Sequence, residues 1–173
     1  MSARGRRSAG ILLFRRTDHG PEVLLGHMGG PFFARRDAGA WTVPKGEYED
    51  GEPPWDAARR EFQEELGLPP PEGEAVPLGE VRQAGGKTVS AWAVEADLDP
   101  AAVEPGTFTM EWPPRSGRVR EFPELDRVEW VGLERARDMI VKAQAAFLDR
   151  LLEHSEGRDP ARHPGGPSWP SRP

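Results

Sequence analysis

The sequence predicts one layered domain in which strands and helices are mixed, and three observations support this fold class. The chain has 173 residues and is 36% hydrophobic, which suits a single domain with its own core. Short β-rich runs are separated by turns that contain glycine and proline. One segment with helical periodicity lies between these runs, and two more follow towards the C-terminus. The expected fold class is therefore α/β in the broad sense, an α+β or α/β/α layered domain.

The N-terminal part of the chain predicts a hairpin and a short third strand. Gly10–Arg15 and Glu22–Met28 are runs that favour strands, and residues 17–21 between them favour a turn. A glycine- and proline-containing loop follows, and Ala40–Val43 is the next expected strand. Antiparallel pairing of the first two strands is the simplest arrangement for so short a connection.

The central helix is expected over Glu52–Leu66. Pro53 and Pro54 suit the first turn of a helix, and Gly67 suits its end. Later strands and the closing helices are expected, in order, at Leu78–Arg82, Lys87–Glu95, Thr107–Trp112, Arg127–Val131, Leu133–Ile140 and Ala143–His154.

The chain divides by composition into a basic, flexible N-terminus (1–8), a folded domain (9–154) and a disordered tail (155–173) rich in proline, glycine and arginine. No stretch approaches the roughly 18 apolar residues of a membrane span, and no run suits a signal peptide. The absence of cysteine excludes disulfides, thiolate zinc sites and cysteine nucleophiles. We expect a cytoplasmic protein that does not associate with membranes.

The negative charge is concentrated in one part of the chain. The formal net charge is -6, which argues against a nucleic-acid partner because such domains are usually basic. Residues 46–74 contain ten acidic residues and two arginines, a net charge of -8, so the rest of the chain carries +2. A local cause is therefore expected for the acidity.

Three carboxylates share one face of the central helix. Glu61, Glu64 and Glu65 are three and four residues apart, and such spacings place side chains side by side. Like charges at these spacings repel, whereas Mg²⁺ or Mn²⁺ would bind such carboxylate oxygens. A solvated charged surface is the other interpretation of these three residues taken alone.

The residues around this triplet complete a longer pattern. From Gly46 the sequence is Gly, five residues, Glu52, seven residues, Arg60-Glu61-Phe62, one residue, Glu64-Glu65, one residue and Gly67-Leu68. This string resembles the complete Nudix box, GX5EX7REUXEEXGU, in which U is a bulky apolar residue. We identify the chain as a member of the Nudix hydrolase family. The most specific part of the resemblance covers Trp41 to Leu68.

The resemblance implies an α/β/α sandwich with a mixed sheet, and hydrolysis of a phosphoanhydride bond in a nucleoside diphosphate linked to another group. It implies Mg²⁺ as the cofactor, with Mn²⁺ as an alternative. By position, the metal ligands would be Glu61, Glu64 and Glu65, with a backbone carbonyl near Lys45 and Gly46. Glu52 and Arg60 match the pair that orients the loop against the helix.

A general base or additional metal ligand is expected outside the box. Similar Nudix enzymes have a functional glutamate shortly before the last strand, and Glu124 holds that position here. Glu111, at the end of an expected strand, is the second choice, and an ordinary surface carboxylate is the alternative for both. The predicted catalytic group is thus Glu52, Arg60, Glu61, Glu64, Glu65 and Glu124.

Two lysines are the leading candidates for phosphate contacts. Trp41-Thr-Val-Pro-Lys45-Gly46 resembles the lead-in of asymmetric dinucleoside tetraphosphate hydrolases, and the strand beginning at Lys87 is similar to one whose lysine contacts phosphate. Lysine is scarce, three against 20 arginines. Further substrate-binding candidates are Arg35, Arg36 and Arg115, with Trp92 for base stacking; weaker ones are Arg118, Phe32, Phe33, Trp112 and Phe147.

Several alternatives stay open from the sequence. The tyrosine that diadenosine polyphosphate hydrolases often place beyond the box is missing, because Tyr48 is the one tyrosine of the chain. A nucleoside or dinucleoside polyphosphate is the first choice of substrate. Oxidised or ordinary nucleoside triphosphates, ADP-ribose and nucleotide sugars follow. A non-catalytic, nucleotide-sensing Nudix domain is the alternative function, and a homodimer is expected by family resemblance.

Overall fold

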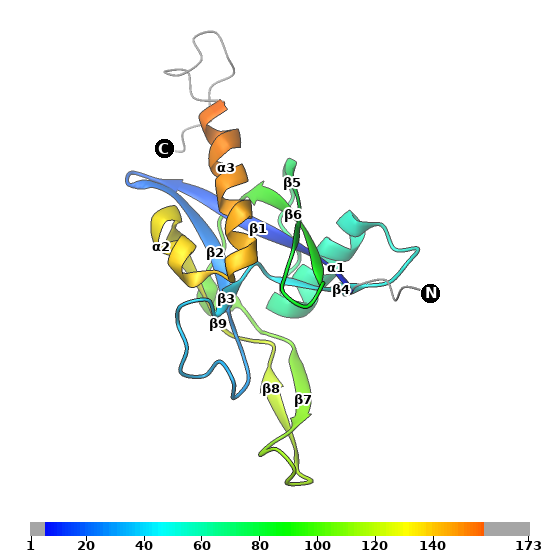
Figure 1. The fold of residues 1–173 in the computed structure, drawn as a ribbon. Coiled ribbons are helices and arrows are strands. Elements are labelled where there is room, and N and C mark those ends of the chain that lie inside the picture. Colours follow the sequence, from blue (N-terminus) through cyan, green and yellow to red (C-terminus); the bar gives the residue numbers. More distant parts are fainter. Residues whose placement is uncertain (1–5, 158–173) are drawn as a thin grey trace.

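The computed structural model describes residues 6–157, which form a mixed sheet with helices on both faces (Figure 1). The order of elements is β1 (Arg7–Thr17), β2 (Gly20–Met28), β3 (Trp41–Thr42), β4 (Lys45–Tyr48), α1 (Pro54–Leu66), β5 (Ala75–Arg82), β6 (Thr88–Glu95), η1 (Pro100–Ala102), β7 (Thr107–Glu111), β8 (Val119–Pro123), β9 (Leu125–Gly132), α2 (Leu133–Met139), η2 (Lys142–Gln144) and α3 (Ala145–Gly157).

The main sheet is organised around β1, which pairs along both of its edges. Its strands follow the order β3-β2-β1-β6-β5, while β4 also pairs with β1 and β9 also pairs with β2. β1 and β6 are parallel, and the other pairs are antiparallel, so the sheet is mixed as expected. β4 lies opposite the start of β1, with Gly10 across from Lys45. The central strand therefore lies between β4, which begins at Lys45, and β6, which directly follows Lys87.

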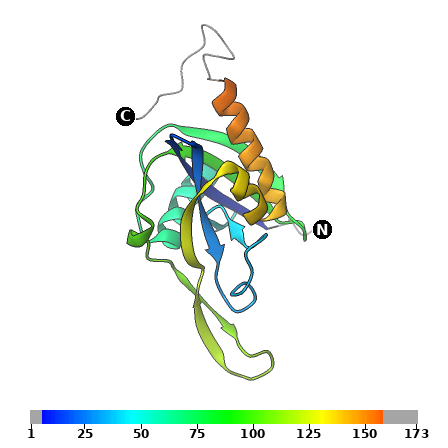
Figure 2. The same ribbon diagram turned by 90° about the vertical axis from the view of Figure 1, so that its left-hand side faces the viewer.

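The two faces of the sheet pack against different helices, as Figure 2 shows. Side chains alternate along a strand, so Ile11 and Leu13 of β1 face α1 whereas Leu12 faces the opposite side. α1 closes the first face with the buried Phe62 and Leu66, and α2 and α3 close the other. Truncating a buried phenylalanine such as Phe62 to alanine typically costs about 3–5 kcal/mol, so this stripe holds α1 in place.

A two-stranded hairpin projects from this body. β7 and β8 pair with each other in a separate small sheet, and both views show the hairpin extending away from the layers (Figures 1 and 2). Its first strand was expected, but β8 was not, because Val119–Pro123 contains two charged residues and one proline. A two-stranded ribbon is marginal alone. Here its root is anchored, since Gly29 donates its N–H to the carbonyl of Glu124 at 2.9 Å.

The predicted fold class and the order of the main elements are confirmed, with changes at the boundaries. α1 begins at Pro54 instead of Glu52, and Gly67 ends it with φ of 69°, a left-handed conformation that glycine adopts readily. β1 begins at Arg7 and α3 continues to Gly157. The remaining parts of the two expected terminal segments, 1–5 and 158–173, lie outside the described residues. No helix in the described range 6–157 is long and apolar enough to cross a membrane.

Candidate active site

The acidic helix approaches the β4 strand so closely that only glycine fits opposite it. A Cβ atom at Gly46 would lie 1.8 Å from Oε2 of Glu61, far inside any permitted contact. Glu61 is 7% exposed, so its carboxylate is fixed beneath the loop. The glycine at the start of the box thus allows the backbone of β4 to lie against the carboxylate-bearing face of α1.

Four carboxylates from two parts of the chain meet in this region. Glu61, Glu64 and Glu65 come from α1, and Glu124 comes from the junction of β8 and β9. Burial raises the pKa of Glu65 to about 8, and repulsion from Glu124 and Glu61 adds to the shift. Burial also raises the pKa of Glu61 and of Glu124 above the usual range. This acidic wall is therefore a cluster of mutually repelling oxygens in a partly dehydrated place.

Arg60 joins the loop before α1 to the acidic wall. Its Nε and Nη2 atoms each lie 2.9 Å from an oxygen of Glu52, a bidentate pair. Its Nη1 atom donates to Glu61 at 2.7 Å and lies 3.2 Å from Glu64. The guanidinium lowers the pKa of Glu52 by hydrogen bonding, and the pKa of Arg60 itself is raised chiefly by its bond to Glu52. The pair thus connects the loop before α1 to the helix, and its orienting role stays a prediction.

A pair of lysines faces the carboxylates. Lys45 begins β4, and Lys87 directly precedes β6. Burial lowers the pKa of Lys45 to about 8, and the neighbouring Lys87 ammonium lowers it further, while Glu65 opposes the shift. Nζ of Lys87 lies 3.4 Å from a carboxylate oxygen of Glu47. Two ammonium groups held together in this way form a suitable binding place for a dianionic phosphate.

These side chains enclose a polar cavity of about 470 Å³. The four glutamates of the acidic wall form one part of its lining, and the two lysines with the fifth acid, Glu47, form another, so the cavity contains both metal-binding and phosphate-binding chemistry. Its lining residues are Lys45, Gly46, Glu47, Glu61, Glu64, Glu65, Lys87, Gly106, Thr107 and Glu124.

The donor set of the acidic wall suits a hard divalent cation. Carboxylate and carbonyl oxygens are the ligands that Mg²⁺ and Mn²⁺ prefer. The pKa of Glu65 is raised first by burial and then by repulsion from Glu124 and Glu61, and a bound cation would offset that repulsion. Within residues 6–157, no three acidic or histidine side chains already stand at ligating distances. Arg60 pairs with both Glu61 and Glu64, and its bond to Glu61 uses Oε1.

The structure separates the two candidates for the additional glutamate. Glu124 lines the cavity, whereas Glu111 lies at the end of β7, where its Oε1 accepts the backbone N–H of Arg115 at 2.7 Å. Glu124 is therefore positioned to act on a group bound in the cavity. Glu111 instead stabilises the turn of the hairpin.

Four predicted substrate-binding residues are not brought to the cavity wall. Trp92 lies on the α1 face of β6 and packs against Trp55 with a centroid distance of 5.4 Å. Arg35 and Arg36 are exposed in the loop between β2 and β3, and Arg115 is exposed at the hairpin turn. The weaker aromatic candidates are also elsewhere: Phe147 is buried in the core, and Phe32 contacts Trp112 in a T-shaped pair. A base-stacking group is thus not identified among the lining residues.

Three of the lining residues are not predicted from the sequence. Glu47 pairs with Lys87 from inside the box, and Gly106 and Thr107 lie at the root of the hairpin. Side chains alternate along a strand, so Glu47 lies on the same side of β4 as Lys45. The sequence pattern of residues 45–48 does not indicate a strand, and so does not reveal this. No comparable signal in the sequence marks Gly106 or Thr107.

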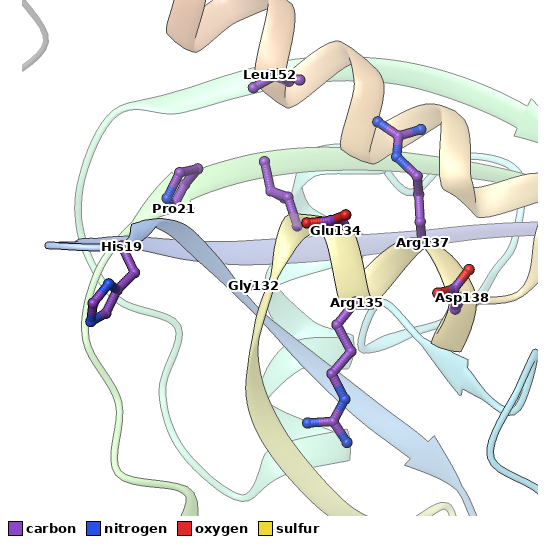
Figure 3. A pocket seen from close by; sticks show the side chains of 9 residues that line it. His19, Pro21, Gly132, Glu134, Arg135, Arg137, Asp138 and Leu152 are labelled. Carbon is purple, nitrogen blue, oxygen red and sulfur yellow. The ribbon is translucent and has the colours of Figure 1, made fainter.

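A second cavity lies away from the acidic wall, between the β1–β2 turn and helices α2 and α3 (Figure 3). Its volume is about 740 Å³, larger than that of the cavity described above. Charges of both signs line it, and Arg137 at its edge is already paired with Asp149 of α3. It lacks a cluster of carboxylates or lysines, so size alone does not make it the reactive site.

Comparison with known proteins agrees with this geometry. The sequence model of the NUDIX domain matches residues 4–151. A stretch of 102 residues is 35% identical to an octanoyltransferase of Myxococcus xanthus, which covers 59% of this chain and 25% of that protein. The chain therefore spans about a quarter of the length of this curated relative.

Among solved structures, the fold is similar to an Ap4A hydrolase of C. elegans in a binary complex, with a TM-score of 0.62 and 22% identity over 86% of this chain and 96% of that one. It is also similar to RenU, a Nudix hydrolase of M. smegmatis, with a TM-score of 0.58 and 25% identity over 98% and 91%. The NUDIX domain of Shewanella oneidensis NrtR, complexed with ADP ribose, has a TM-score of 0.59 and 15% identity over 89% and 90%.

Proposed function

The chain belongs to the Nudix family, and on that premise we propose that it is a pyrophosphohydrolase whose polar cavity cleaves a nucleoside or dinucleoside polyphosphate with the help of Mg²⁺ or Mn²⁺. One observation carries this proposal. Glu61, Glu64, Glu65 and Glu124 share a single cavity with Lys45 and Lys87. Carboxylates alone would repel a phosphate, and lysines alone would bind it without activating water; the cavity contains both.

The acidic wall would hold the cation through Glu61, Glu64 and Glu65, with a backbone carbonyl oxygen of Lys45 or Gly46 as a further ligand. When bound, the cation supplies Lewis acidity towards a phosphate oxygen and a water of lowered pKa.

The side chains of this chain have separate tasks in the reaction. Lys45 and Lys87 bind non-bridging phosphate oxygens and fix the phosphorus that is attacked. Glu124 accepts the proton of the attacking water, the oxygen of that water bonds to phosphorus, and the bridging P–O bond breaks with its electron pair on the departing phosphate. Arg60 and Glu52 hold the loop against α1, so they orient the acidic wall without contacting the substrate.

A polyphosphate attached to a nucleoside is the substrate class that we favour. The Trp41-x-x-Pro44-Lys45-Gly46 string and the similarity in fold to an Ap4A hydrolase support it. The NUDIX domain complexed with ADP ribose supports the alternative of ADP-ribose, and nucleotide sugars and oxidised nucleoside triphosphates complete the set to be compared. The cytoplasmic location, the homodimer and the absence of a nucleic-acid partner stay predictions from the sequence.

The test is a substrate panel with Mg²⁺ or Mn²⁺ and identification of the products by mass. Dinucleoside tetraphosphates, nucleoside triphosphates, oxidised triphosphates, ADP-ribose and nucleotide sugars are compared at equal concentration. We expect the highest kcat/KM for a di- or mononucleoside polyphosphate, with loss of turnover in chelator. Tight binding of a nucleotide without any product in either metal would contradict hydrolysis and identify a nucleotide-sensing domain.

A further inference from the structure

Gln144 is a fully buried glutamine between α2 and α3. It lies in η2 and is 0% exposed. A buried carboxamide is costly unless its polar atoms are hydrogen-bonded. Its Oε1 accepts the backbone N–H of Val43 at 2.9 Å, and its Nε2 donates to Oε1 of Gln83 at 2.8 Å and to the hydroxyl of Thr42 at 3.0 Å. One side chain thus connects two segments that are 40 residues apart in the chain.

Both of these segments lead directly to a lysine of the cavity. Val43 is two residues before Lys45, and the intervening Pro44 has a fixed φ, so a displacement of Val43 is passed on to Lys45. Gln83 donates its backbone N–H to the carbonyl of Lys87 at 2.7 Å and closes the β5–β6 turn. The carboxamide of Gln144 therefore lies between the chain segments that carry the two lysines.

The lysine pair requires such a connection. The two ammonium groups repel each other, and Lys45 and Lys87 belong to segments on opposite edges of β1. Pairing with β1 fixes each segment separately, while the hydrogen bonds of Gln144 join the segments to one another. A phosphate that bridges two ammonium groups binds well only when their separation suits its oxygens.

We propose that Gln144 is a positioning residue for substrate phosphate, because its carboxamide sets the separation of Lys45 and Lys87. The inference rests on the function proposed above for the cavity. The competing interpretation is that Gln144 is an ordinary buried amide whose loss lowers stability and nothing else. The two interpretations differ at Gln83, which is partly exposed and whose side chain bonds to Gln144 alone among the described residues.

The first test removes the connection on the Lys87 side. Gln83→Met deletes the acceptor for Gln144, and Gln144→Glu keeps the acceptor for the Val43 N–H but deletes the donor to Gln83. We expect each to raise KM about tenfold while kcat stays within about threefold, the pattern of a lost binding interaction. Gln63→Met, at an exposed glutamine of α1, is the matched control and should leave both constants unchanged.

The second test asks whether the effect passes through the lysine. In a Lys87→Met background the change Gln83→Met should alter KM by less than about twofold, because the positioned group is gone. An equal, roughly tenfold effect in both backgrounds would overturn the proposal, as would an unchanged KM in the otherwise intact protein. Thermal unfolding of each variant, followed by circular dichroism, shows that the compared proteins are folded.

Binding of inorganic pyrophosphate, measured by calorimetry with Mg²⁺, separates this inference from the proposed function. If the unaltered protein cleaves no nucleotide, the proposed function fails, and the pyrophosphate affinity still decides the role of Gln144. A Kd about tenfold weaker in Gln83→Met than in the unaltered protein supports the positioning role. Equal Kd values in the two proteins overturn it.

Discussion

Two regions of the molecule are rich in charge, and they differ in the burial of their charged groups and in the pairing between them. In the cavity, Lys45 and Glu65 are largely buried among other charges, and the pKa of each lies near 8. The second region, here called the arginine surface, comprises the exposed Arg35, Arg36, Arg115, Arg118 and Arg120 of the β2–β3 loop and the hairpin.

No side chain of the arginine surface forms an ion pair with another residue of the described range, although Arg120 lies over the ring of Phe122. Solvent and salt weaken the electrostatic interactions of its guanidinium groups, whereas burial strengthens the interactions between the charged groups of the cavity. Residue type alone thus does not identify a binding group. The difference lies in whether the fold holds a charge next to others away from water.

The largest expected effect is the loss of carboxylates from the acidic wall. Glu64→Gln or Glu65→Gln removes a negative ligand for the cation while keeping the size of the side chain. We expect kcat to fall by at least about 10²-fold, with α-helical circular dichroism unchanged. Glu153→Gln, at an exposed carboxylate of α3, is the matched control. Full turnover in both cavity variants would show that the reaction takes place elsewhere.

A smaller but clear loss is expected when the guanidinium at position 60 is replaced. Arg60→Lys keeps the charge but cannot bond Glu52 with two parallel hydrogen bonds while also reaching Glu61. Groups that orient metal ligands typically contribute about 10–100-fold, so kcat should fall by that factor. Activity within about twofold of the unaltered enzyme would mean that the loop stays in position without the two parallel hydrogen bonds of the guanidinium.

The buried charges also predict an unusual dependence of stability on pH in metal-free protein. The pKa of Glu65 is raised from 4.5 to about 8, so between these pH values the folded state binds more protons than the unfolded state. Protonated Glu65 therefore contributes to stability fully below pH 4.5. This contribution is lost as the pH rises through 8. The pKa of Lys45 is lowered from 10.5 to about 8, so its unfavourable contribution, greatest below pH 8, is relieved between pH 8 and 10.5.

Glu65→Gln should therefore stabilise the metal-free protein at pH 8 by about 3 kcal/mol relative to its effect at pH 5. Urea unfolding in chelator at the two pH values measures this difference. A variant whose effect on the free energy of unfolding is the same at both pH values would show that burial and the neighbouring carboxylates do not raise the pKa of Glu65. Added Mg²⁺ should reduce the difference because it neutralises the same charges.

The smallest effect is expected at the arginine surface. Arg35→Ala and Arg115→Ala remove exposed charges that do not line the cavity, so kcat/KM should change by less than about threefold. Assays at low and high salt, with Arg135→Ala of α2 as an exposed control, measure this. A tenfold or greater loss confined to long dinucleoside polyphosphates would instead show that substrate extends to the hairpin.

The sequence predicted those parts of the molecule that local pattern determines. Helical spacing and the glycines of the box placed Glu61, Glu64 and Glu65 correctly on one helix face. The strand at Lys45–Tyr48 was missed because it has no alternation of apolar and polar residues, and it forms by pairing with β1. Periodicity does not reveal which face of a strand looks towards a cavity, so Trp92 was assigned to substrate although it packs on α1.

Contacts between distant segments could not be predicted from the sequence. The meeting of Lys45 with Lys87 depends on β4 and β6 pairing with β1, and the approach of Glu124 depends on the root of the hairpin. The burial of Gln144 could not be predicted, since glutamine is a residue type that is mostly exposed. Long-range packing determines these features.

In the proposed function, a divalent cation converts the acidic wall from a phosphate-repelling surface into a phosphate-binding one. The most direct measurement is the calorimetric affinity of a non-hydrolysable dinucleoside tetraphosphate for the unaltered protein and Glu65→Gln, with and without Mg²⁺. We expect Mg²⁺ to tighten binding by about 10²-fold in the unaltered protein and much less in the variant. Equal affinity with and without Mg²⁺ in the unaltered protein would contradict the account.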